Sequence, residues 1–266
     1  MLKFYGDIIG QNVNEETIYY QGSDTENNYR KQLQTMPKDW YYNNNPIAYT
    51  YNKTGHRCKN IEELDFNNYI LYIGDSNTEG IGLHVEDTYV YKTSKSLGLD
   101  YYNLGLGGTG IEVLNYNLTY WLNTYPAPKF VVLYWSDPAR SLCLKENNNK
   151  LEFYNVGPWS IQNYNLRFLH LGDSIGYFRA RYELLSKSII TQLKSKKIPH
   201  YNFTYVPESS LPKFNVDQFL FVDCARDGKH PVFMDVARDG KHPGIISNEQ
   251  ICTKLLEIFH EYNIPR

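Results

Sequence analysis

The sequence predicts an α/β fold, in which helices cover both faces of a mostly parallel β-sheet. Short apolar runs rich in β-forming residues alternate along the chain with amphipathic segments of helical period. Such short apolar runs are typical of strands that are buried on both faces. At 266 residues, the chain suits one large domain or two small ones and can bury most of its apolar surface.

Five apolar runs are the predicted strands, and four amphipathic segments are the predicted helices. The strands are expected at residues 68–75, 100–105, 130–136, 201–206 and 219–222. The helices are expected at residues 87–97, 109–124, 175–196 and 248–260. Asp87 and Thr109 are the expected N-caps of the first two helices, and Pro199 ends the third. A parallel sheet of this kind places its site at the carboxyl ends of the strands.

Several segments lie outside this alternation. Residues 1–66 are polar and irregular, and we expect an arm or small subdomain packed on the core, with short strands near residues 47–51. The main domain is then 67–266. Residues from about 143 to 165 show little periodicity and are predicted to be an insertion. Residues 223–243 contain a duplication, because DCARDGKHP recurs twelve positions later as DVARDGKHP.

Charge and composition exclude several classes of function. The 27 basic and 29 acidic residues give a formal net charge of −2, which argues against nucleic acid or an anionic membrane as the main partner. No apolar run approaches the roughly 18 residues of a membrane span, and the first residues lack the plan of a signal peptide. We therefore expect a soluble, cytoplasmic protein. The four cysteines form no CxxC pair, so we predict free thiols and no metal site.

A serine and a histidine–aspartate pair stand where such a sheet would place its chemistry. The first predicted strand ends in Gly-Asp-Ser-Asn, so Ser76 lies on a strand-to-helix turn. A serine is a weak nucleophile until a base takes its proton. Asp239 precedes His242 by three residues, a spacing that lets the carboxylate orient the imidazole within one turn.

With a glycine-rich segment, these residues resemble the SGNH hydrolases, also called the GDSL esterase and lipase superfamily. Residues 74–77 (GDSN) resemble the family's first block, residues 103–109 (NLGLGGT) its second, and residues 239–242 its last. The resemblance implies a flavodoxin-like three-layer α/β/α sandwich with a mostly parallel five-stranded sheet. It also implies hydrolysis of acyl esters without a metal or other cofactor.

The resemblance assigns roles to single residues. Ser76 is the expected nucleophile, His242 the base, and Asp239 the group that orients the base. The expected oxyanion hole contains the N–H groups of Ser76 and Gly108, with Gly105 as a lesser candidate.

The third family block departs from the pattern. The family has Gly-x-Asn-Asp after the third strand, with the Asn side chain as an oxyanion donor, whereas residues 134–137 here are YWSD. Ser136 occupies the Asn position, and losing one such donor costs about 10²–10³ in rate. Three alternatives stay open: Ser136 donates instead, Asn77 or a water compensates, or the site binds without catalysis.

The duplication supplies a second Asp-x-x-His pair, Asp227 and His230. The copy with Asp239 and His242 is preferred, because Gly244 and an amphipathic helix follow it, as in the family. The first copy is then a looped-out relic or a rim that contacts the substrate.

Four residues near the site are candidates for contact with a substrate: Asn77, Trp135, Tyr134 and Arg57. Tyr134 and Trp135 form either an apolar wall for the acyl group or part of the sheet core. Arg57 is interpreted first as a bond from the arm to the core, and second as a contact with an anionic or sugar substrate. Glu79 and His84 are expected to be exposed loop residues.

These residues favour a serine esterase that acts on short acyl esters, including O-acetyl groups on carbohydrate. The expected partner is therefore a small-molecule or carbohydrate ester. Two alternatives use the same fold: a catalytically weak carbohydrate-binding or structural accessory protein, and an O-acyltransferase with the same residues.

Overall fold

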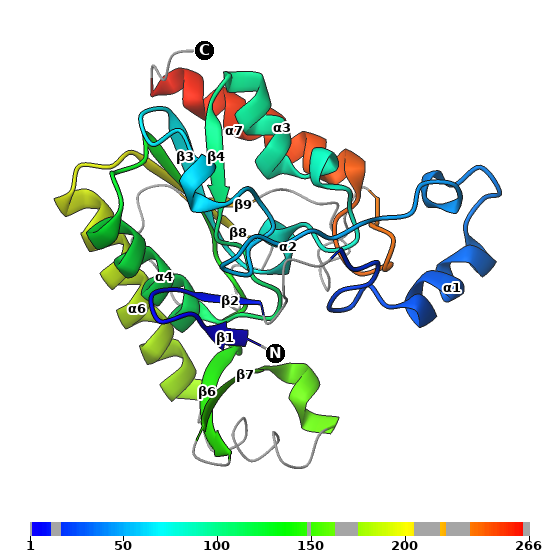
Figure 1. Cartoon of the computed structure of the whole chain (residues 1–266), viewed down its shortest axis with the longest axis horizontal. Helices are drawn as coiled ribbons and strands as arrows, with labels where there is room; N and C mark the ends of the chain where they lie inside the picture. Colours follow the sequence, from blue (N-terminus) through cyan, green and yellow to red (C-terminus); the bar gives the residue numbers. More distant parts are fainter. Residues whose placement is uncertain are drawn as a thin grey trace.

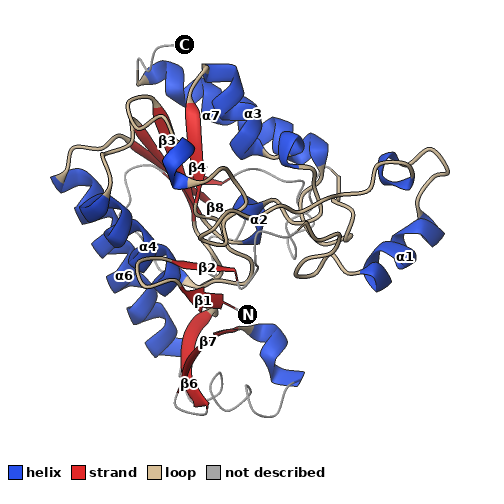
Figure 2. Cartoon of the chain, viewed as in Figure 1, coloured by secondary structure: helices blue, strands red, loops and turns tan. Residues whose placement is uncertain are grey.

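A parallel five-stranded sheet forms the centre of the computed structural model, which describes residues 2–11, 17–147, 150–162, 175–204, 219–221 and 235–262. The strand order is β4-β3-β5-β8-β9, and every neighbouring pair is parallel. Figures 1 and 2 show strands β3, β4 and β8 of this sheet among the surrounding helices. The strands are Tyr69–Ile73 (β3), Asp100–Asn103 (β4), Phe130–Tyr134 (β5), His200–Thr204 (β8) and Phe219–Phe221 (β9). Numbered along the chain, this order is 2-1-3-4-5, that of flavodoxin-like folds. The predicted fold class is confirmed.

Helices cover both faces of this sheet and complete three layers (Figure 1). They are Tyr89–Leu97 (α3), Ile111–Thr124 (α4), Ile175–Ser195 (α6) and Ile245–Glu261 (α7). Side chains alternate along β3 as the pleat requires. Leu71 and Ile73 join the core beneath α4 and α6, whereas Ile70 and Tyr72 join the core beneath α3 and α7.

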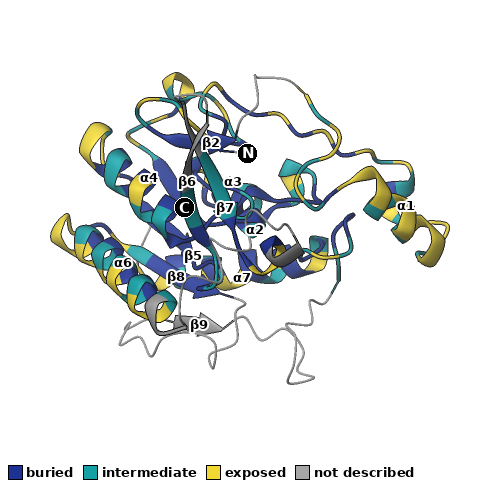
Figure 3. Ribbon diagram, turned by 90° about the horizontal axis from the view of Figure 1, so that it is seen from below, coloured by how far each residue is buried: buried dark blue, intermediate teal, exposed yellow. Residues whose placement is uncertain are grey.

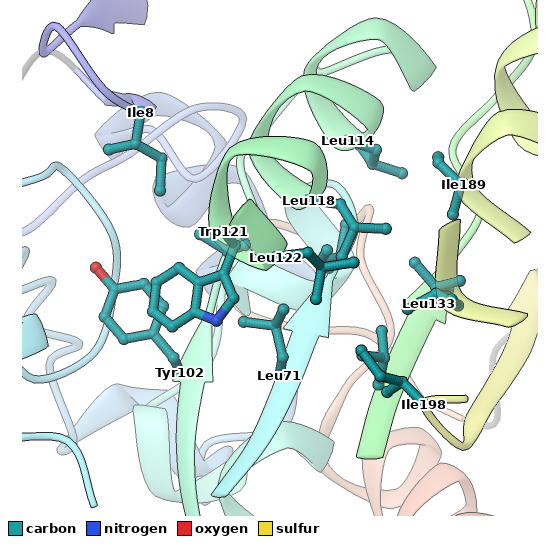
Figure 4. Packing of buried hydrophobic residues seen from close by; sticks show 14 of the residues in the cluster. Ile8, Leu71, Tyr102, Leu114, Leu118, Trp121, Leu122, Leu133, Ile189 and Ile198 are labelled. Atoms are coloured by element: carbon teal, nitrogen blue, oxygen red, sulfur yellow. The ribbon is translucent and has the colours of Figure 1, made fainter. Parts of the chain in front are cut away.

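Both cores are closed to solvent. Every residue of β3 and β5 is buried, which explains why these strands are continuous apolar runs in the sequence. Figure 3 shows this burial for β5. On one face, Leu118 and Leu122 of α4 point toward the sheet around Leu71 (Figure 4). On the other, the rings of Phe130 and Phe259 lie 4.4 Å apart. Full burial of such a side chain stabilises the fold by about 1.5–3 kcal/mol.

Two predicted helix caps are wrong. Thr88, not Asp87, caps α3, and its hydroxyl accepts a hydrogen bond of 3.2 Å from the third N–H of the helix. Helix α4 begins after Gly110, and the Thr109 hydroxyl donates to the Leu106 carbonyl at 2.7 Å instead of capping the helix.

Helix α7 begins at Ile245, earlier than the predicted start at residue 248. The Asp235 carboxylate accepts hydrogen bonds from the N–H groups of Ile246 at 3.0 Å and Ser247 at 2.9 Å. This carboxylate accepts hydrogen bonds from the free N–H groups of the first turn, although Asp235 lies well before the helix in the sequence. The residues next to the helix therefore carry no capping signal.

A second sheet is antiparallel and joins the N-terminal residues to the middle of the chain, in the order β2-β1-β7-β6. Its strands are Leu2–Phe4 (β1), Ile9–Gln11 (β2), Ser141–Asn147 (β6) and Lys150–Val156 (β7). The segment 143–165, where the sequence shows little periodicity, therefore contains most of a β-hairpin. Its pairing is non-local, since Leu2 lies opposite Phe153.

Residues 17–60, which we call the arm, pack against the chain that follows β3. Helix α1 (Glu26–Thr35) buries none of its residues and is largely exposed in Figure 3. The rest of the arm shares an apolar cluster with the core domain: Tyr42, Ile47, Tyr49 and Tyr51 with Ile81, Leu83 and Ala237. In place of the short strands expected near residues 47–51, the structure has an isolated bridge between Ile18 and Tyr49.

The described residues also contain a short helix, Ser76–Glu79 (α2), and 3₁₀ turns at Tyr41–Asn43, Ile61–Glu63, Val85–Asp87 and Pro158–Gln162. Among the described residues, Cys58, Cys143 and Cys252 form no disulfide bond, and Cys224 lies outside those residues. Within the described ranges, no helix has both the length and the apolar character needed to cross a bilayer.

Candidate active site

Ser76 lies where β3 turns into the short helix α2 (Ser76–Glu79). Asp75 caps this helix, because its Oδ1 accepts a hydrogen bond of 2.9 Å from the Asn77 N–H. A Cβ at Gly74 would lie 2.0 Å from Thr78 Oγ1, so only glycine lets the turn pack this tightly. Because β3 has β4 on one side and β5 on the other, this turn is at the switch point of the sheet, where α/β folds bind ligands.

His242 joins Ser76 to Asp239 through two hydrogen bonds. Its Nε2 lies 2.8 Å from Ser76 Oγ, and its Nδ1 lies 2.7 Å from Asp239 Oδ2. The preferred copy of the duplicated motif therefore reaches the serine. The other copy, Asp227 and His230, lies outside the described residues.

The surroundings of Asp239 favour its charged form. The residue is only 2% exposed, and burial alone raises the pKa of a carboxyl group. Hydrogen bonding and charge from His242, the Ser23 hydroxyl and the Lys241 N–H outweigh burial and lower the pKa of Asp239 to about 2. At neutral pH the Asp239 carboxylate is therefore charged and accepts the Nδ1 proton, so Nε2 is left to accept the proton of Ser76.

Ser23 is a member of this cluster that sequence reasoning missed. Its Oγ donates a hydrogen bond of 2.6 Å to Asp239 Oδ2 and lies 3.3 Å from His242 Nδ1. Ser23 belongs to the arm, 216 positions before Asp239. No local pattern marks it, because a serine beside a glycine is ordinary turn chemistry.

The glycine-rich loop after β4 lies beside the serine, since a Cβ at Gly107 would be 3.8 Å from Ser76 Cβ. The Gly105 N–H donates to Asn103 Oδ1 at 2.9 Å, and the Gly107 N–H donates to Glu79 Oε2 at 2.5 Å. Gly108 has a φ of +76°, and its N–H has no acceptor among the described residues. Gly108 is thus a better candidate than Gly105 for an amide that faces a ligand.

Glu79 is buried, although the sequence predicted an exposed loop residue. It is 1% exposed and also accepts a hydrogen bond of 2.5 Å from the Tyr51 hydroxyl. Burial raises the pKa of Glu79, while Tyr51, Arg57 and the Gly107 N–H act in the opposite direction. Its structural effect is to fix the glycine loop against α2. His84 is half-buried and stacks on Tyr42.

Ser136 does not donate a hydrogen bond within the described residues. It is fully buried, and its hydroxyl oxygen has no partner there. Its carbonyl accepts a hydrogen bond of 2.8 Å from Tyr182. The residue in the position of the family's Asn is therefore closed off from solvent.

The candidates for contact with a substrate lie in different environments. The Asn77 side chain donates to Asp75 Oδ1 at 2.9 Å and to the Tyr134 hydroxyl at 3.1 Å. Trp135 is 1% exposed and packs near Tyr182 in the sheet core. The core interpretation is therefore favoured for Trp135, whereas Tyr134 contacts the turn that carries Ser76.

Arg57 is 2% exposed, and its donors are used inside the protein. Its guanidinium donates to the carbonyls of Gly80 at 2.5 Å and Leu83 at 2.7 Å, and it stacks on the Tyr49 ring at 4.4 Å. These bonds hold the arm to the chain after α2. They favour the structural interpretation of Arg57 over contact with a substrate.

Arg140 and Trp159 border the site, and sequence reasoning missed both. Arg140 pairs with Asp75 at 2.5 Å and lies over the Trp159 ring at 5.4 Å. Trp159 is 47% exposed, and a Cβ at Gly108 would be 3.7 Å from its ring. An exposed indole therefore lies next to the glycine loop.

Among the described residues, no group of three or more His, Cys, Asp or Glu is arranged to hold a metal ion.

No protein-family model and no curated protein matches the chain. Among solved structures, the chain is similar to a G-D-S-L family protein from Desulfitobacterium hafniense, with 11% identity over 72% of this chain and 99% of that chain and a TM-score of 0.49. It also matches a G-D-S-L family protein from Veillonella parvula, with 14% identity over 72% and 98% of the two chains and a TM-score of 0.41. A family 2 carbohydrate esterase from Corynascus thermopiles has 16% identity over 72% and 65% of the two chains and a TM-score of 0.43. All three matches have a TM-score below 0.5, so the chemistry of the site is inferred from this chain's own residues alone.

Proposed function

We propose that the protein is a serine esterase of the SGNH type. The observation that carries the proposal is the continuous chain of hydrogen bonds from Ser76 through His242 to Asp239, at 2.8 and 2.7 Å. Ser76 Oγ attacks the ester carbonyl while His242 Nε2 takes its proton, and Asp239 stabilises the resulting imidazolium. His242 then protonates the leaving alkoxide. A water, deprotonated by His242, hydrolyses the acyl-serine and regenerates the enzyme.

Two backbone donors are proposed to stabilise the oxyanion. Ser76 is the first residue of α2, so its N–H has no partner within the helix. The N–H of Gly108 has no acceptor among the described residues. The buried hydroxyl of Ser136 lends no support to a third donor. We therefore expect a slower esterase than one with all three donors, by about 10²–10³.

The substrate is proposed to be a short acyl ester of a carbohydrate. The exposed indole of Trp159 beside Gly108 supports this class, because the C–H face of a pyranose packs well on a flat aromatic ring. Its neighbour Arg140 adds donors for hydroxyl groups.

The loss of the third donor at Ser136 favours one alternative, a carbohydrate-binding protein whose catalysis is weak or lost. The decisive experiment measures hydrolysis of p-nitrophenyl acetate by the wild type and by Ser76→Ala, His242→Ala and His230→Ala. We expect the first two variants to lose at least about 10³-fold in kcat, and His230→Ala to keep wild-type activity.

Labelling with a fluorophosphonate separates an enzyme from a binding protein. An activated Ser76 is labelled in the wild type and not in Ser76→Ala, whereas an inactive wild type that resists the probe refutes the proposal. Full activity in Ser76→Ala also refutes it. An inactive His230→Ala variant would show that the base is His230, in the other copy of the motif. Acetylation of an added sugar acceptor would identify a transferase.

A further inference from the structure

We infer that Ser23 is a positioning residue of the triad, delivered by the arm to the carboxylate that orients the base; this inference rests on the proposed function. Its hydroxyl donates to Asp239 Oδ2, the same oxygen that lies 2.7 Å from His242 Nδ1. The other oxygen, Oδ1, accepts the N–H groups of Lys241 at 3.0 Å and His242 at 3.1 Å. Four donors thus fix both oxygens of a buried carboxylate.

The turn that carries Ser23 is fixed by its own hydrogen bonds. Gln21 and Asp24 exchange two backbone hydrogen bonds of 3.0 Å, and Gly22 takes the positive φ of +60° that the turn requires. The Asn28 side chain donates to the Ser23 carbonyl at 2.7 Å. The Ser23 hydroxyl is therefore presented at a defined place.

The neighbours of Ser23 and Asp239 in the sequence, Asp24 and Arg238, form a buried ion pair. Asp24 accepts hydrogen bonds from Arg238, which directly precedes Asp239, at 2.6 Å from Nη2 and 3.1 Å from Nε. Their side chains are 0% and 3% exposed, and the Tyr49 hydroxyl donates to Asp24 at 2.5 Å. The pair Ser23–Asp24 thus binds the pair Arg238–Asp239 by two adjacent side-chain contacts.

The chemical consequence concerns the imidazolium that forms during the reaction. A carboxylate held on both oxygens stays in the plane of the ring while the proton moves from Ser76 to His242. Without the Ser23 hydroxyl, Oδ2 keeps only His242 Nδ1 as a donor, and the carboxylate can rotate out of the plane of the ring. The loss should therefore appear in kcat, whereas KM reports substrate contacts that Ser23 does not make.

The test compares Ser23→Ala, Ser23→Thr and Thr25→Ala in p-nitrophenyl acetate hydrolysis. Ser23→Ala should lower kcat about tenfold, equivalent to about 1.4 kcal/mol, with KM unchanged. Ser23→Thr keeps the hydroxyl and should recover most of this activity. Thr25→Ala removes the N-cap of α1, where Thr25 Oγ1 accepts the Asn28 N–H at 3.1 Å, and should leave kcat unchanged.

A spectroscopic readout keeps the inference separate from the proposed function. The low-field proton NMR signal of His242 Nδ1–H should shift in Ser23→Ala and return toward its wild-type position in Ser23→Thr, in active or inactive protein. Activity independent of Ser76 refutes the proposed function. An unchanged signal and kcat in folded Ser23→Ala, or equal losses in the Ala and Thr variants, overturn the inference about Ser23.

Discussion

Replacing Asp24 by Asn tests whether the arm is fixed to the loop that carries Asp239. The amide has the volume of the carboxylate, so no cavity forms, but the Arg238 charge stays buried without its counter-ion. Both side chains are almost inaccessible, at 0% and 3% exposure. Removing one member of such a pair costs about 3–5 kcal/mol, because the remaining charge has left water without compensation.

The assay is urea unfolding at neutral pH, with the midpoint and slope fitted together. A lower midpoint with an unchanged slope means lower stability of the same folded state. Glu26→Gln is the matched control, because its partner Arg30 belongs to the same arm and both side chains are exposed, at 55% and 71%. That variant should show no change beyond the error of the fit.

A double variant separates the unpaired charge from loss of packing. Asp24→Leu with Arg238→Met replaces the ion pair by apolar side chains and should regain much of the stability that Asp24→Asn loses. A loss below about 1 kcal/mol in Asp24→Asn would refute the reasoning, because the pair would then behave as a hydrated surface pair. A double variant no more stable than Asp24→Asn would show that the charge is not the cause.

Three further predictions concern the site and the core. The folded pKa of Asp239 is about 2 against an ordinary 3.8, so its charge stabilises the fold above pH 3.8, and this contribution, about 2 kcal/mol, is lost as the pH falls toward 2. In urea titrations, the free energy of unfolding should therefore fall less between pH 4 and pH 2 in Asp239→Asn than in the wild type. An equal fall in both proteins would contradict the low pKa. Trp159→Ala should raise KM for an acetylated sugar roughly threefold to tenfold, from about 0.5–1.5 kcal/mol of stacking, with KM for p-nitrophenyl acetate unchanged; equal effects on both substrates would rule out stacking on the sugar. Leu118 lies fully buried on the sheet-facing side of α4, so Leu118→Ala should lower the free energy of unfolding by about 2–5 kcal/mol in urea titrations, and a loss under about 1 kcal/mol would be inconsistent with this packing.

The sheet and its helices could be predicted because their signals are local. A strand buried on both faces, such as β3, must be apolar along its length, and α4 repeats its apolar residues at helical spacing. Ser76, Asp239 and His242 could be named because each stands in a short motif. The structure then brings these three side chains within hydrogen-bonding distance.

The remainder depends on contacts between distant segments. Ser23 acquires its place only when the arm meets residues 235–243, and Asp235 caps α7 from outside the helix. Glu79 is predicted to be solvated because its hydrogen-bond partners, Tyr51 and the N–H of Gly107, are distant in the sequence. Charged and hydroxyl side chains are usually exposed, so a prediction made without these partners assigns them to the surface.

The contact between Asp24 and Arg238 also bears on the biosynthesis of the protein. The two residues are 214 positions apart, so at about 5–20 residues per second the ribosome adds Arg238 roughly 10–40 s after Asp24. During that interval the central strands β3, β4 and β5 are complete, yet Asp24 lacks its counter-ion Arg238. The arm can pack on residues 80–83 early, but its contacts with Arg238 and Asp239, which complete the hydrogen-bond network of the site, must be among the last to form as the nascent chain folds.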